Sequence, residues 1–192
     1  MSKLIYGVGY NSRRSFKTTK NGKSTKAYSS WNHMIERCYS VKKHKERPTY
    51  IGCTVHSHWH DFQNFAEWYY AQDYCDEGYH LDKDLLFPNN KVYSPDFCCL
   101  VPNEINNLII EYSSNMGENL RGAIWDKSVG KYISRITIDG KGKRLGTFDC
   151  AQEAHQAYKV AKELYVKEKA LQWRDRIAPN VFNALMNWQL IS

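Results

Sequence analysis

The stretch from residue 120 to residue 170 places three short strand-like runs directly before one long helical run. Apolar and polar side chains alternate in the middle run, residues 131 to 138, as expected for a strand with two different faces. The helical run that follows carries Ala154, Ala157 and Ala161 on one side. Because small side chains let a helix lie close to a sheet, we predict a three-stranded antiparallel sheet packed on one helix.

The ends of these elements can also be predicted. Strands are expected at residues 124–125, 131–138 and 143–148, separated by the glycine-containing turns DKSVGK and DGKGK. A threonine or aspartate at the start of a helix accepts a hydrogen bond from a free backbone N–H group. Thr147 or Asp149 is therefore the expected cap of the helix.

This stretch resembles a known family, the Apetala-two or ethylene-response-factor type of DNA-binding domain. The matching landmarks are Arg121-Gly122, Gly130-Lys131-Tyr132, Leu145-Gly146-Thr147-Phe148, and a helix with Glu153, Ala154, Ala157 and Tyr158. In that family the sheet lies in the major groove of DNA, which is wide enough to admit strands. The resemblance implies DNA binding by Arg121, Trp125, Lys127, Lys131, Arg135 and Arg144. Ile124 and Asp126 replace base-contacting arginines of the plant domains, so the plant sequence preference is not expected here.

The overall charge agrees with a polyanionic partner. The chain has a formal net charge of +7 and a pI near 9.0, which favours a partner such as double-stranded DNA. No apolar run approaches the roughly 20 residues needed to span a bilayer, and the first residues lack the apolar core of a signal peptide. We therefore expect no membrane association and a cytoplasmic location.

The first 112 residues show a different organisation. Residues 1–27 are basic and lack apolar periodicity, which predicts a mobile arm or a hairpin tip. Helical spacing of apolar residues from Trp31 to Cys38 predicts a helix capped by Ser29 or Ser30, and Asp61 precedes a second amphipathic helix. We expect four parts, with a linker at 113–119: a basic arm (1–27), a first domain (28–112), the sheet-and-helix module (118–170) and a helical extension (171–192).

The segment from His80 to Leu108 has the order strand, loop, strand, helix. That order resembles the ββα-metal core of HNH endonucleases, and residues 28–108 are similar to phage proteins described as HNH homing endonucleases. The resemblance implies that the cytoplasm is that of a phage-infected bacterial host cell. The resemblance implies that Asp82 and Asn106 hold a divalent ion, Mg²⁺ or Mn²⁺, with Asn103 and Asn107 as rivals of Asn106. We thus expect an α+β protein with an HNH-like domain followed by the DNA-binding module.

One position departs from the HNH pattern. Lys83 stands where the family has the histidine that activates water, and a lysine is a poor base at neutral pH unless burial lowers its pKa. His80, two residues earlier on the same strand face as Asp82, is one replacement for the base. Asp84 is another, with Lys83 steadying the charge of the transition state. In the third interpretation the domain binds DNA without cutting it.

Two further clusters have metal-ligand chemistry. Cys38, Cys53, Cys98 and Cys99 are candidates for a structural zinc site with one histidine, although no CxxC spacing is present. The competing interpretation is that they are buried thiols in an aromatic core. His56, His58 and His60 alternate, but a helix expected nearby would prevent them from sharing a face.

These features lead to one main functional hypothesis and two alternatives. The main hypothesis is a metal-dependent DNA endonuclease of the phage homing type that hydrolyses phosphodiester bonds in duplex DNA. The first alternative is a catalytically inactive DNA-binding phage protein, a regulator or an inhibitor of host defence, that keeps the nuclease scaffold. The second is an RNA-binding protein, in which the many aromatic side chains would stack on bases.

Overall fold

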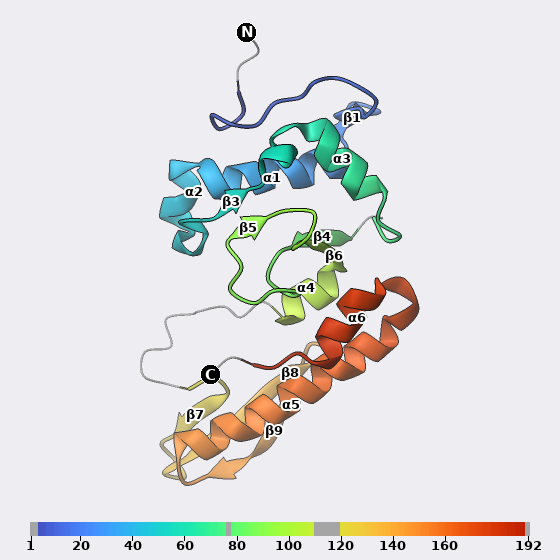
Figure 1. The fold of residues 1–192 in the computed structure, drawn as a ribbon. Helices are drawn as coiled ribbons and strands as arrows, with labels where there is room; N and C mark the ends of the chain where they lie inside the picture. The colour runs from blue at the N-terminus through green and yellow to red at the C-terminus, as the bar shows by residue number, and fades with distance from the viewer. Residues whose placement is uncertain (1–3, 76–77, 110–119, 191–192) are drawn as a thin grey trace. The chain divides into compact units, whose positions relative to one another are not determined.

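A computed structural model describes residues 4–75, 78–109 and 120–190 of the chain (Figure 1). Helices and small sheets alternate along the chain, so the protein belongs to the α+β class. Within the described residues, none of the helices has the length and apolar character needed to cross a membrane. The linker expected at 113–119 lies outside the described residues.

The chain folds as two compact units. The first contains Met1–Asn106 and Asp175–Val181, and the second contains Asn107–Arg174 and Phe182–Ser192. The division between them falls at Asn106/Asn107, a few residues before the expected end of the first domain at residue 112. Each unit has its own buried apolar residues and is described by itself below.

Three helices form most of the first unit: α1 (Lys26–Tyr39), α2 (Val41–Glu46) and α3 (Phe62–Tyr70). The helical periodicity predicted for α1 and α3 is confirmed, because its apolar positions are the buried ones. Aromatic rings from both helices meet in the core, as in the edge-to-face contact of Trp31 with Phe62 at 5.7 Å. Short 3-10 turns at Pro48–Tyr50 and Ser57–His60 connect the helices.

The cap predicted for α1 is wrong. The helix begins at Lys26, and Thr25 caps it by accepting a hydrogen bond from the backbone N–H of Tyr28 at 3.3 Å. Ser29 and Ser30 lie inside the helix. The helix starts earlier because Ala27 continues its apolar face and is fully buried, a small residue that gave little signal in the sequence.

The amino-terminal segment is part of the folded first unit, where the sequence indicated a mobile arm or a hairpin tip. A short hairpin is present, formed by β1 (Thr19–Lys20) and β2 (Lys23–Ser24). The residues before it are held against the start of α3, because Tyr10 forms a parallel bridge with Asp61. Side chains of α3 satisfy the backbone of this segment, which therefore needs no apolar periodicity of its own.

Two small sheets complete the first unit. Strand β3 (Thr54–Val55) pairs with β5 (Val92–Tyr93) in parallel, and β4 (Tyr79–Asp82) pairs with β6 (Cys99–Pro102) in antiparallel orientation. Helix α4 (Asn103–Ile109) follows β6 without a loop. The predicted order of strand, loop, strand and helix is therefore present, with β5 inside the loop.

The second unit contains a three-stranded antiparallel sheet in the order β7-β8-β9. Its strands are β7 (Ala123–Asp126), β8 (Lys131–Ile138) and β9 (Lys141–Phe148), and all three pack against α5 (Ala151–Gln172). Figure 1 shows α5 running along one face of the sheet. The predicted three-stranded antiparallel sheet packed on one helix is therefore confirmed.

The cap predicted for α5 is wrong, and its carboxyl end lies slightly beyond the expected limit of the module. Cys150 occupies the capping position and makes no side-chain hydrogen bond, while Asp149 pairs with Lys131 instead, at 2.8 Å. A 3-10 turn at Arg174–Arg176 leads to α6 (Pro179–Met186). After α6, the backbone N–H of Leu190 donates to the carboxylate of Glu163 on α5 at 3.1 Å, so the terminal segment packs back as expected.

The close approach of α5 to the sheet leaves no room for a side chain at Gly122. Its φ is +74°, and a Cβ added there would overlap the side chain of Tyr158. We expect Gly122→Ala to lower the free energy of unfolding by about 2–5 kcal/mol, because backbone strain and overpacking act together. Gly140 also has a positive φ, +76°, but open space around it, so Gly140→Ala should cost about 1 kcal/mol. Urea denaturation of both variants tests this, and equal losses would contradict the packing explanation.

Candidate nucleic-acid interface and metal centre

The exposed face of the β7–β9 sheet carries two arginines directly opposite each other. Arg135 on β8 pairs in register with Arg144 on β9, next to a bulge between Ser134 and Arg135. Side chains alternate along a strand, so Arg135 lies on the face opposite Ser134 and Ile136. Those two residues are buried, and Arg135 and Arg144 are exposed, which identifies the arginine-bearing face as the one turned away from α5.

This arrangement of like charges is unfavourable in the free protein. Like charges directly opposite on neighbouring strands destabilise a sheet. Arg144 donates a hydrogen bond to the Thr147 hydroxyl, but in the described part of the chain neither arginine forms a salt bridge. An anion placed between the two guanidinium groups would remove the repulsion, and phosphate matches their hydrogen-bonding geometry.

The acidic residues of the sheet are engaged elsewhere. Asp139, in the turn between β8 and β9, pairs with Lys169 of α5 at 2.7 Å and accepts a hydrogen bond from Tyr165 at 3.0 Å. Asp126 accepts two hydrogen bonds from Ser128, and these bonds lower the pKa of its carboxyl. The aspartates therefore fix turns and helix contacts. Arg144 attracts the Asp126 carboxylate at longer range, and neither Arg135 nor Arg144 has a salt-bridge partner among the described residues.

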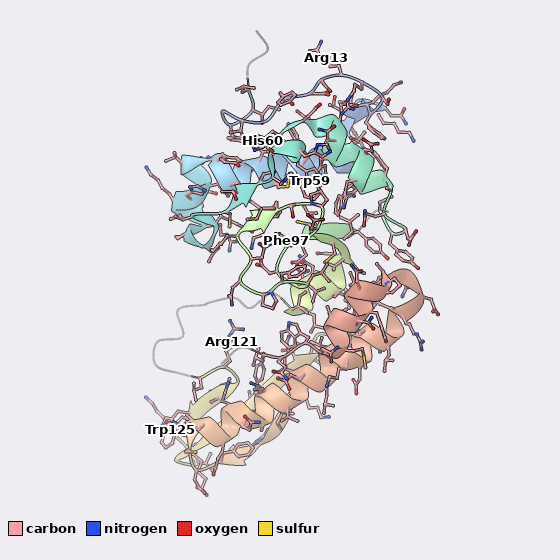
Figure 2. The ribbon with its side chains drawn as sticks, viewed as in Figure 1. Arg13, Trp59, His60, Phe97, Arg121 and Trp125 are labelled. Atoms are coloured by element: carbon pink, nitrogen blue, oxygen red, sulfur yellow. The ribbon has the colours of Figure 1, made fainter. Side chains whose placement is uncertain are left out.

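The other residues predicted to contact DNA do not all lie on the face of Arg135. Lys127 is exposed in the β7–β8 turn, and Lys131 shares the face of Arg135 but pairs with Asp149. Trp125 lies on the edge strand β7 (Figure 2), opposite Tyr132 with the two rings edge to face at 4.9 Å.

Register gives Trp125 the face of Ser134, opposite to that of Arg135. Arg121 is half-buried just before β7, and its backbone carbonyl accepts a hydrogen bond from the His155 ring at 2.8 Å. The structure thus brings Arg135, Arg144 and Lys131 onto one face but does not place Trp125 there.

The residues expected to form a metal centre lie on the β4–β6 hairpin and on α4. Leu81 of β4 pairs with Leu100 of β6, and both belong to the apolar core of the first unit. His80 and Asp82 lie on the opposite face of β4, since side chains alternate along the strand. This is the common face that the sequence predicted for these two residues.

Asp82 has one oxygen engaged and one available. Its Oδ1 atom accepts hydrogen bonds from the backbone N–H groups of Asp84 at 2.9 Å and Leu85 at 2.7 Å. Oδ2 accepts none among the described residues. Burial raises the pKa of this carboxyl, and the two backbone hydrogen bonds partly oppose that shift. An available, poorly solvated carboxylate oxygen is suitable as a ligand for a hard divalent cation.

The helix position expected to complete the centre is also available. Asn106 is half-buried on α4, and its side chain makes no hydrogen bond with another described residue. Its two rivals are both engaged in interactions, and both are more exposed. Asn106 is therefore the better candidate of the three. Across residues 4–75, 78–109 and 120–190, no three histidine, cysteine, aspartate or glutamate side chains form a metal-binding group.

Lys83 is a buried structural residue. Only 7% of its surface is exposed, and its Nζ donates hydrogen bonds to Asp84 Oδ1 and to the backbone carbonyl of Asn90, both at 2.6 Å. The Asn90 side chain closes the same loop by binding the backbone of Lys83 and Val92. Because its ammonium group is buried and hydrogen-bonded within the β4–β5 loop, Lys83 stabilises that loop and is not placed to activate water.

Replacement of Lys83 tests this assignment. We expect Lys83→Met to lower the free energy of unfolding by about 2–3 kcal/mol, because two hydrogen bonds to a charged group are removed and the Asn90 carbonyl is left without a donor. Any hydrolytic activity per folded molecule should persist. Urea denaturation and activity below the transition measure the two effects. Unchanged stability with abolished activity would instead give Lys83 a direct catalytic role.

The two other candidates for the base differ in their surroundings. Asp84 is about half exposed and paired with Lys83, which makes it part of the loop structure. His80 is exposed. Partial desolvation lowers the pKa of its imidazole, and the positive charges of Arg37 and Lys26 lower it further. Of these two residues, His80 is the one with an exposed, uncommitted side chain.

The cysteines are packed as apolar residues. Cys38, Cys53 and Cys98 belong to the same core cluster, whereas Cys99 follows on β6 beside Asp82 in the register. Burial raises the pKa of Cys38 and Cys98 to about 12, so these groups are neutral thiols. Core packing accounts for them without an ion, and the zinc site stays a prediction.

Two features of these surfaces were not predicted from the sequence. Asn90 was given no role, although the Asn89-Asn90 pair after Pro88 indicated a turn held by side chains. The position of the hairpin around Asn21-Gly22 was not assigned either, although a hairpin tip was one of the two interpretations of residues 1–27 and this dipeptide is a strong local signal for a two-residue turn. Comparison with known proteins adds no assignment, since no family model, curated protein or solved structure matches the chain.

Proposed function

We propose that the protein is a DNA-binding, metal-dependent endonuclease whose two units have different tasks. The second unit binds duplex DNA, and the first hydrolyses a phosphodiester bond. The observation that carries the proposal is the Arg135–Arg144 pair, two opposed guanidinium groups that have no carboxylate partner among the described residues and lie on the exposed face of a small sheet. A phosphate-lined partner converts this unfavourable pair into a favourable one.

Duplex DNA suits this face better than RNA. The major groove of B-form DNA is wide enough to receive a small group of strands, whereas the major groove of A-form RNA is deep and narrow. An extended, pleated basic surface also lacks the exposed row of stacking aromatics used for single strands, because Trp125 packs against Tyr132. Binding to duplex DNA should therefore exceed binding to single-stranded RNA.

Hydrolysis is assigned to the face of β4 and α4. Asp82 and Asn106 would hold a divalent ion, which supplies Lewis-acid polarisation of the phosphate. His80 lies on the same face as Asp82 and accepts the proton of the attacking water at its free ring nitrogen. Lys83 keeps the loop after β4 in place and takes no part in the proton transfer, and the backbone N–H groups of Asp84 and Leu85 hold the Asp82 carboxylate.

One observation favours a non-catalytic alternative. Lys83, which replaces the histidine of the resembled family, is built into the loop by two hydrogen bonds, as expected for a scaffold that has lost hydrolysis and kept binding. In that case the protein acts as a DNA-binding regulator or an inhibitor of host defence.

A plasmid nicking assay with Mg²⁺ or Mn²⁺ separates the two functions, and competition binding with duplex DNA and single-stranded RNA tests the partner. The endonuclease predicts nicked or linear product only with the ion and tighter binding of duplex. Absence of any cutting with duplex binding intact would establish the alternative. Tighter binding of RNA would contradict both.

A further inference from the structure

The amino-terminal part of the first unit carries many positively charged side chains and no carboxylate side chains of its own. Glu36 is the first acidic residue of the chain, so residues 1–35 contain lysines and arginines and no carboxylate side chains. Five of these cations have exposed side chains and, among the described residues, no salt-bridge partner. They are Arg13, Lys17, Lys20, Lys23 and Lys26.

The hairpin concentrates this charge at its tip. Lys20 and Lys23 are paired in register on either side of a two-residue turn. The turn residues Asn21 and Gly22 both have positive φ, 52° and 73°, the conformation typical of tight hairpins. Two lysines directly opposite each other repel, so the hairpin, like the β8–β9 pair, has an arrangement that an external anion stabilises.

The cationic segment is fixed in place by α3. Gln63 is 1% exposed, and its amide accepts a hydrogen bond from the backbone N–H of Phe16 at 2.8 Å and donates to Asn11 Oδ1 at 2.7 Å and to the Phe16 carbonyl at 2.9 Å. Asp61 Oδ1 accepts from the backbone N–H of Ser12 at 3.1 Å. A surface ordered in advance loses less entropy on binding than a mobile tail.

One arginine of the segment belongs to this anchor. Arg14 donates to the side chain of Asn64 and lies 3.6 Å from Asp61 Oδ2. The neighbouring Arg13 has a positive φ of 55°, and Figure 2 shows its side chain directed away from the body of the unit. The segment thus uses Arg14 to hold itself and presents Arg13 to solvent.

We propose that this surface, formed by Arg13, Lys17, Lys20, Lys23 and Lys26, is a second binding site for the phosphate backbone of duplex DNA. Four of these five side chains carry ammonium groups, which supply charge and few base-specific contacts, and this is the chemistry of sequence-independent backbone binding. The site belongs to the unit that carries Asp82 and Asn106 and holds DNA on that unit. The inference rests on the proposed function and adds an interface to it.

The test uses the full chain with Lys17, Lys20 and Lys23 replaced together by glutamine. These side chains are exposed, so the fold should be retained, and the melting temperature verifies it. The control variant replaces Lys42, Lys45 and Arg47 by glutamine, which removes the same charge from another exposed part of the unit. Affinity for a random-sequence duplex is measured over a range of salt concentrations.

The proposal predicts weaker duplex binding by the hairpin variant than by the control. The slope of log Kd against log salt concentration should also be shallower in the hairpin variant, by up to about three. Equal affinities and slopes for the two variants would overturn it. The outcome is distinguishable from failure of the proposed function, because an Arg135→Gln/Arg144→Gln variant measured in parallel should lose affinity whether or not the hairpin contributes.

Discussion

Replacing Arg135 and Arg144 together by glutamine should raise the Kd for duplex DNA by roughly thirtyfold or more. A hydrogen bond to a charged group contributes about 1.5–3 kcal/mol, and 1.4 kcal/mol corresponds to a tenfold change in affinity. The same double variant should be no less stable than the wild type, because the repulsion between two opposed cations is removed with them. Fluorescence anisotropy with a labelled duplex and thermal denaturation measure the two effects.

A charge-matched control separates local binding from overall charge. Lys42→Gln/Lys45→Gln removes two exposed charges from α2 in the other unit and should change the Kd much less. An equal loss of affinity in both double variants would show that net charge alone governs binding. Loss of stability together with affinity in the arginine variant would attribute its effect to unfolding.

Asp82→Asn should lower the rate of metal-dependent cutting by about a hundredfold while leaving the Kd for duplex DNA unchanged. Loss of a ligand that supports a Lewis-acid ion removes on the order of 3 kcal/mol of transition-state stabilisation, and each 1.36 kcal/mol is tenfold in rate. Asparagine keeps an oxygen that accepts from the backbone N–H groups of Asp84 and Leu85, the two bonds that order this loop. Single-turnover cutting at saturating protein isolates the chemical step.

Two companion variants make this result interpretable. Asn106→Ala should also lower the cutting rate. Raising the Mn²⁺ concentration should partly restore cutting by both Asp82→Asn and Asn106→Ala. Asp84→Asn serves as the control, since Asp84 is exposed and bound to Lys83, and it should cut at nearly the wild-type rate. Wild-type cutting by Asp82→Asn would remove Asp82 from the ion site.

Local patterns in the sequence were sufficient to predict the regular elements. Alternation over residues 131–138 and the Asp139-Gly140 turn predict β8 and β9, since both signals depend on neighbouring residues only. Apolar spacing from Trp31 to Cys38 likewise predicts the buried face of α1. The helix caps were predicted less well, because several polar residues near each helix start were able to serve.

The features that the sequence did not reveal depend on interactions between distant residues. Lys83 resembles an exposed charge at a strand end, and its burial follows from the Asn90 carbonyl seven residues later. The amino-terminal segment has no pattern of its own, because Gln63, 47 residues beyond Phe16, supplies its hydrogen bonds. Trp125 was expected at the DNA, but register with Tyr132 places it on the opposite face from Arg135.

The salt dependence of duplex binding is the sharpest check on the proposal that the Arg135–Arg144 face binds phosphates. Wild-type affinity should fall steeply as salt rises, because each neutralised phosphate releases counterions. The slope of log Kd against log salt concentration should become shallower by about two in Arg135→Gln/Arg144→Gln, since each of the two arginines neutralises one phosphate. Identical slopes for the wild type and this variant would contradict the claim.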